Sequence, residues 1–74
     1  DLDTGLLRAF LALAETLSFS RTADRIGRSQ SAVSMQIMRL EEILGCRLFR
    51  RDRRNVALTA EGEALLGDAR RILA

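Results

Sequence analysis

The side chains best suited to binding a ligand are the arginines near the middle of the chain. All 12 basic residues are arginine, and five of them fall between Arg47 and Arg54, where Asp52 is the only acid. A guanidinium group matches phosphate oxygens with two parallel N–H donors and keeps its charge at physiological pH. The cluster therefore indicates binding of nucleic acid or another polyanion, against the alternative of an ordinary solvated loop.

The residue types give little support to catalysis. The chain has no histidine and no tyrosine, and Cys46 is its only cysteine. A Cys/His nucleophile pair, a zinc site of the Cys/His kind and an intrachain disulfide are therefore excluded. We expect Cys46 to pack half-buried. Glu41 and Glu42 are adjacent, so on a helix they point about 100° apart and do not make a paired-carboxylate site; we expect them to form a solvated face. The sequence predicts no enzyme activity, no metal and no cofactor.

Length and composition predict one small folded domain. The chain has 74 residues, of which 47% are hydrophobic and 30% charged, as is typical of a globule with a modest core. No apolar run approaches the roughly 20 residues that cross a bilayer, and the first residues do not resemble a secretory signal. The expectation is a soluble cytoplasmic protein without a membrane partner.

Two short helices and a hairpin must position the candidate ligand-binding residues. Ser18 and Ser29 are placed to cap helices over residues 19–26 and 30–44, and a glycine follows each helix as a stop. Two helices joined by a tight turn can present the second one to the major groove of DNA. The hairpin is predicted from short strands at residues 47–50 and 56–58, with Leu48 or Phe49, Val56 and Leu58 packed inward.

The helix over residues 30–44 is predicted to have a buried side and a ligand-binding side. Its apolar seam is Val33, Ile37, Leu40 and Leu44. The opposite face is short-chained and uncharged near its start, which is unusual for a face that serves only solubility. We expect contacts with base edges from Gln30, Ser31, Ser34 and Met35, because glutamine can bond adenine N6 and N7 and methionine can touch a thymine methyl. The alternatives are that Met35 and Met38 are additional core residues or form half of an interface with another protein.

Helix starts and the hairpin are expected to hold the DNA backbone. Hydroxyls and N–H groups at helix starts suit phosphate, and a narrow minor groove attracts arginine. The predicted contacts with the backbone or minor groove are Ser20, Arg21, Ser29, Arg50, Arg51, Arg53 and Arg54.

A helix at each end is predicted to complete the domain. The first is capped by Asp3 or Thr4 and runs to about Leu17, with an apolar stripe for the core. The last is capped by Thr59, and its stripe extends beyond what the domain of residues 1–58 would cover. The residues of that stripe, predicted to form a homodimer, are Leu65, Leu66, Ala69, Ile72 and Leu73. The alternative is a fourth helix whose first half folds back on the core of its own chain.

Four segments stand in a characteristic order between Leu7 and Leu66: SFSRTADRI, SQSAVSMQIMRLEEILG, RLFRR and LTAEG. In these segments the chain resembles the N-terminal domain of LysR-type transcriptional regulators. The resemblance implies a mainly α fold, a winged helix-turn-helix with a three-helix core and a two-stranded wing over residues 1–58. A linker helix that pairs subunits would occupy residues 59–74. It also implies sequence-specific binding of double-stranded DNA by a bacterial regulator.

The same resemblance implies an effector-binding domain that this chain does not contain. A small-molecule effector would act only through that domain, and oligomers beyond the dimer would need the full-length protein. In the family, base contacts come mainly from positions that match Gln30, Ser31, Ser34 and Met35, and wing contacts from positions that match Arg53 or Arg54.

Three features depart from the family pattern. Ser31 stands where proline is common, and Arg28 replaces an apolar turn residue, although its aliphatic stem can still pack. Met35 and Met38 stand where arginine or lysine is frequent. We therefore expect the arginine hairpin to supply much of the affinity and the helix to supply mainly selection.

Overall fold

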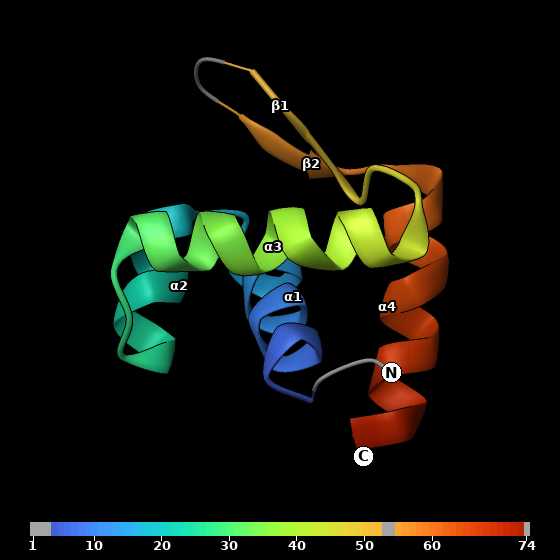
Figure 1. Cartoon of the computed structure of the whole chain (residues 1–74), viewed down its shortest axis with the longest axis horizontal. Coiled ribbons are helices and arrows are strands. Elements are labelled where there is room, and N and C mark those ends of the chain that lie inside the picture. Colours follow the sequence, from blue (N-terminus) through green and yellow to red (C-terminus); the bar gives the residue numbers. More distant parts are fainter. Residues whose placement is uncertain (1–3, 53–54, 74) are drawn as a thin grey trace.

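The computed structural model describes residues 4–52 and 55–73, and in them it has four helices and one hairpin (Figure 1). The helices are α1 (Thr4–Thr16), α2 (Phe19–Ile26), α3 (Gln30–Leu44) and α4 (Ala60–Leu73). The strands β1 (Phe49–Arg51) and β2 (Val56–Leu58) are antiparallel, with Phe49 opposite Leu58 and Arg51 opposite Val56. The mainly α winged helix-turn-helix predicted from the sequence is confirmed.

Local sequence sets the ends of α2 and α3 where they were predicted. The Ser18 hydroxyl accepts the Arg21 N–H at 3.2 Å, and the Ser29 hydroxyl accepts the Ala32 N–H at 3.1 Å. Gly27 and Gly45 follow the helices with φ values of 69° and 71°. Residues with a Cβ adopt this left-handed conformation only at a cost, so the two glycines stop the helices and redirect the chain.

The core lies where α1 crosses behind α3 (Figure 1). Its buried apolar residues are Leu6, Leu7, Ala9, Phe10, Leu13, Ala23, Val33, Ile37, Leu40, Leu48, Phe49 and Ala69. The rings of Phe10 and Phe49 pack with their centroids 5.5 Å apart. Because both Leu48 and Phe49 are buried, the base of the hairpin is part of the core rather than an appendage.

Several predictions of detail were wrong. Leu17 lies outside α1, has a φ of 52° and is 43% exposed, because the chain turns there toward α2. Leu44 is 38% exposed, because it lies in the last turn of α3, beyond the crossing with α1. Glu41 is buried instead of solvated. The first strand begins at Phe49 rather than Arg47: the Leu48 N–H bonds to the Glu41 carboxylate, and the Arg47 carbonyl accepts from the Thr59 hydroxyl.

The start of α4 is fastened to the wing. The Thr59 hydroxyl accepts the Gly62 N–H at 3.0 Å, which confirms the predicted cap, and donates to the Arg47 carbonyl at 2.7 Å. Gly62 packs so closely on Leu48 that a Cβ would collide with the carbonyl oxygen of that residue and approach Leu58 Cδ2 to 2.8 Å. A glycine is therefore required by the close approach of the two segments.

The stripe along α4 divides between the core and the solvent. Leu65 and Leu66 are half-buried against the core of the same chain, and Ala69 is fully buried there. Ile72 is 63% exposed, and the side chain of Leu73 lies outside the described part. Thus the first part of α4 folds back on its own domain. Within the described residues, no helix is both long enough and apolar enough to span a membrane.

Candidate nucleic-acid interface

The predicted base-contacting face of α3 is open to solvent. Gln30 and Ser31 are exposed in its first turn, and Ser34 is half-buried one turn later. Met35 is 70% exposed and Met38 is 54% exposed, while Val33 on the opposite side is fully buried. The helix therefore has a buried apolar side and an exposed side with polar and methionine side chains, as its sequence pattern predicts.

A pair of serine hydroxyls marks the start of each of the two helices. Ser18 and Ser20 lie with their Oγ atoms 3.2 Å apart, and Ser29 and Ser31 repeat the arrangement at the same distance. Ser18 and Ser29 are committed to capping, so Ser20 and Ser31 are the hydroxyls better placed to meet a ligand. Helix N-termini carry partial positive charge, which suits phosphate. Arg21 is exposed in the first turn of α2 and adds a full charge there.

Arg51 links the wing to both helices of the helix-turn-helix. Its guanidinium donates to Ser34 Oγ at 3.3 Å and lies 4.8 Å from the centroid of the Phe19 ring. With Gln30 and Ser31, these residues line a shallow pocket of about 340 Å³. Arg51, which was predicted to contact the DNA backbone or minor groove, lies beside the first half of α3. Sequence reasoning missed this grouping because its members are far apart along the chain.

The wing projects away from α3 (Figure 1). Arg50 is exposed on β1, opposite Ala57 on β2. Near the tip, the Asp52 carboxylate accepts the Asn55 N–H at 2.8 Å, and the Asp52 N–H donates to the Asn55 carbonyl at 3.0 Å. Arg53 and Arg54, which were predicted to contact DNA, lie outside the described residues.

Ion pairs involve arginines on other parts of the described surface. Arg25 pairs with Glu15 at 2.7 Å, on the side of α2 that faces α1, and Arg71 pairs with Asp68 on α4. Exposed pairs of this kind contribute little to stability, but they offset the charge of their arginine. Arg50 forms no ion pair with any described residue, so its charge remains available to an anionic ligand.

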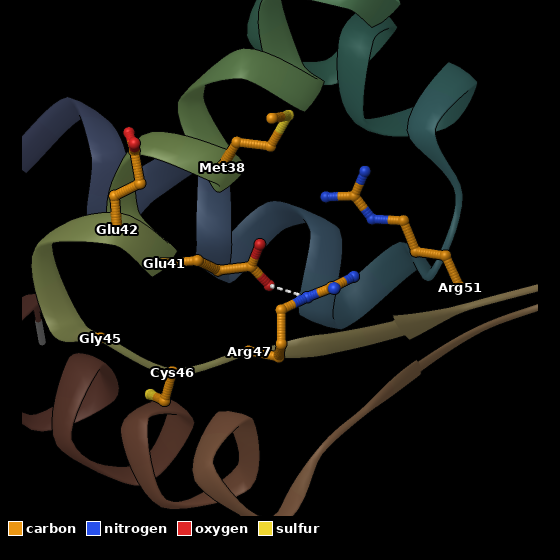
Figure 2. A pocket seen from close by; sticks show the side chains of 7 residues that line it. All are labelled: Met38, Glu41, Glu42, Gly45, Cys46, Arg47 and Arg51. Atoms are coloured by element: carbon orange, nitrogen blue, oxygen red, sulfur yellow. Dashed lines mark ion pairs between the residues drawn. The ribbon is translucent and has the colours of Figure 1, made fainter.

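A second pocket, of about 470 Å³, lies between the C-terminal half of α3 and the wing (Figure 2). It is lined by Met38, Glu41, Glu42, Gly45, Cys46, Arg47 and Arg51. Glu41 Oε2 accepts the Leu48 N–H at 2.8 Å and lies 3.7 Å from Arg47 Nε. The sequence did carry a signal for the burial of Glu41, because this residue stands four positions after Ile37 and shares its side of the helix.

Comparison with protein families and sequences gives a consistent match. The model of the family described as "Bacterial regulatory helix-turn-helix protein, lysR family" matches residues 4–63. The HTH-type transcriptional regulator DgdR of Burkholderia cepacia is 51% identical over 72 residues, which are 97% of this chain and 24% of DgdR. PecT of Dickeya dadantii is 48% identical over 73 residues, 99% of this chain and 23% of PecT. The chain spans about a quarter of the length of these curated relatives.

Solved structures of other proteins also share the fold of this chain. The CbnR_DBD–DNA complex superposes with a TM-score of 0.93 at 40% identity, covering 97% of this chain and 83% of that one. The BenM_DBD/benA site 1 DNA complex gives a TM-score of 0.92 at 38% identity, covering 97% and 81%. Both matched chains were solved in complexes with DNA.

Proposed function

The chain belongs to the lysR family of bacterial regulatory helix-turn-helix proteins, as a DNA-binding domain, and we propose that it binds double-stranded DNA sequence-specifically at promoters. The observation that carries the proposal is the shared surface of α3 and the wing. An exposed, uncharged helix face and an arginine-bearing hairpin lie on one side of the fold, joined by the contact of Arg51 with Ser34. The agreement of the fold with two DNA-bound domains supports the same assignment.

In this proposal the start of α3 enters the major groove. Gln30 would bond adenine N6 and N7, Ser31 and Ser34 would accept or donate to several bases, and Met35 would touch a thymine methyl. Gln30, Ser31 and Met35 are exposed, and Ser34 is half-buried beside Arg51, which leaves all four near the surface for such contacts. Because a serine hydroxyl can bond to several different bases, Gln30 would contribute most of the discrimination between base pairs by hydrogen bonding.

Phosphate contacts would supply most of the affinity. Ser20 and Arg21 would contact the backbone from the start of α2. Ser29, whose hydroxyl accepts the Ala32 N–H as a cap, would contact it with the hydroxyl's own donor. Arg50, with Arg53 and Arg54 at the tip, would follow the backbone or enter the adjacent minor groove. Arg51, which donates a hydrogen bond to Ser34, would lie between the phosphate contacts of the helix starts and those of the wing.

The wider assembly is also a proposal, because the chain spans about a quarter of its relatives. We propose that α4 pairs two copies, with exposed Ile72 as the main apolar contact. Ala69 is buried within its own chain and adds no surface, while Leu65 and Leu66 can contribute their exposed edges. Two copies would read half-sites about one or two helical turns apart. An effector-binding domain, higher oligomers and action in the bacterial cytoplasm belong to the same proposal.

A second candidate function, a protein-docking module, has one observation in its favour. Met35 and Met38 expose flexible apolar side chains, which also suit protein partners. Such docking would not require the arginines of the wing.

Selection of duplexes from a random pool tests the proposed function. The chain is expected to enrich a defined half-site, and the enriched pools should show one preferred spacing if two copies bind together. Retention of duplexes without any enriched sequence would refute base recognition, and retention of none would refute DNA binding.

A further inference from the structure

Glu41 accepts several backbone hydrogen bonds where α3 ends and the wing begins. The carbonyl oxygen of Glu41 accepts the N–H groups of Gly45 at 2.8 Å and Cys46 at 3.2 Å. Its carboxylate accepts the N–H groups of Leu48 at 2.8 Å and Phe49 at 3.4 Å. Four of the five N–H groups from residue 45 to residue 49 therefore point to Glu41, which sets the path of this connection.

The carboxylate is enclosed, and its hydrogen bonds account for its burial. The Glu41 side chain is 9% exposed, and a buried charge is costly unless it is hydrogen-bonded and paired. Bonds from N–H groups to a carboxylate are stronger than bonds between neutral groups. Arg47 Nε, at 3.7 Å, adds an ion pair from the open side of the pocket (Figure 2). The neighbouring Glu42 is exposed.

We propose that Glu41 is a positioning residue for DNA binding, which fixes the direction in which the wing leaves the recognition helix. The inference rests on the proposed function, because it concerns how the two DNA-contacting parts are held together. The N–H groups that Glu41 anchors, those of Leu48 and Phe49, directly precede Arg50 and Arg51. Glu41 thereby sets the distance between the α3 face and the wing cations without touching DNA itself.

Electrostatics alone predicts the opposite effect of losing this carboxylate. Glu41 places a negative charge between α3 and an arginine-bearing strand, so its removal would raise the attraction of the surface for phosphate. If Glu41 positions the wing, removal of its charge will instead weaken binding. The sign of the change therefore separates the two explanations.

Glu41→Gln and Glu42→Gln form a matched pair for this test, because each removes one negative charge from adjacent positions. Binding of both variants to a mixed-sequence duplex would be measured by fluorescence anisotropy over a range of KCl concentrations. Glu42→Gln should bind as tightly as the unaltered chain or more tightly, with the same salt slope. Glu41→Gln should bind several-fold more weakly, with a slope shallower by about 1 for each lost phosphate contact. Equal tightening by both variants would overturn the proposal.

A variant that keeps the charge covers the case in which Glu41→Gln fails to fold. Glu41→Asp retains the carboxylate but is shorter by one methylene, so it cannot reach both N–H groups in the same geometry. With folding verified by circular dichroism at the temperature of the assay, Glu41→Asp should also show the shallower slope. A folded Glu41→Asp with an unchanged slope and reduced thermal stability would mean that Glu41 serves the fold alone. Absence of binding by the unaltered chain would refute the proposed function instead.

Discussion

Arg51 donates a hydrogen bond to Ser34 Oγ at 3.3 Å and so connects the wing to the exposed face of α3. The same guanidinium lies 4.8 Å from the ring centroid of Phe19, the first residue of α2. Both helices of the helix-turn-helix and the wing thus meet at one side chain. These contacts join the two parts of the proposed DNA-binding surface, the α3 face and the wing.

Arg51→Lys should weaken this connection although it preserves the charge. A lysine ammonium is a compact point charge and cannot stack on Phe19 and bond Ser34 with a planar group. We expect a loss of about 0.5–1 kcal/mol in the free energy of unfolding, as for an exposed cation–π contact, and weaker duplex binding. Urea denaturation and fluorescence anisotropy provide the measurements. Arg50→Lys is the control and should leave stability unchanged. No change in either variant would show that only charge matters, and equal losses in both would refute a special role of the Arg51 contacts.

Gln30→Ala should reduce selectivity more than general affinity. Loss of a bidentate contact with adenine is expected to cost about 1–3 kcal/mol on the selected half-site and to relax the preference at one position. Binding to a duplex of scrambled sequence should change little. Titrations of both duplexes measure the difference. Equal losses on the two would contradict the role assigned to Gln30.

Arg54→Ala, in contrast, should weaken binding to most sequences alike. A phosphate contact carries no sequence information, so its loss should lower affinity uniformly and reduce the salt slope by about 1. The same two duplexes provide the measurement. A loss confined to the selected half-site would assign Arg54 to base recognition instead.

The close contact between α4 and the wing gives a prediction about stability. Gly62→Ala places a methyl group against the Leu48 carbonyl and Leu58, and overpacking of this kind costs about 1–3 kcal/mol. Gly67→Ala is the matched control on the same helix, because a Cβ there meets nothing within 4 Å. It should stabilise the protein by about 0.5–1 kcal/mol through helix propensity. Urea denaturation compares the two, and similar changes in both would disprove the steric constraint at Gly62.

Exposed Ile72 predicts self-association through α4. Ile72→Asp should shift the chain toward monomer in sedimentation velocity runs, because a charge replaces the apolar side chain that a partner helix would cover. The unaltered chain should show a concentration-dependent dimer. Only monomer at high concentration of the unaltered chain would refute pairing through this fragment.

Features set by near neighbours were predictable from the sequence. The caps at Ser18 and Ser29 and the glycine stops depend on a few adjacent residues, and their positions were predicted correctly. The exposure of Met35 and Met38 followed from helical periodicity in the same way.

Features set by contacts between elements were not predictable. Helical periodicity places Glu41 on the side of Ile37, but the hydrogen-bond partners of its carboxylate depend on the path of the hairpin, since those N–H groups belong to residues 48 and 49. The contact of Arg51 with Ser34 spans 17 positions of the chain. Periodicity along a helix contains no information about which distant segment will cover it.

The dependence of duplex binding on salt tests the central claim most directly. If Arg21, Arg50, Arg51, Arg53 and Arg54 each neutralise one phosphate, a plot of log K against log salt should fall with a slope of about −4.5 per bound copy. A docking module for neutral protein surfaces would show no such dependence. The measurement is a KCl titration of the chain with duplex DNA. A steep fall in affinity is predicted, and a salt-insensitive affinity, or no binding to any duplex at low salt, would contradict the account.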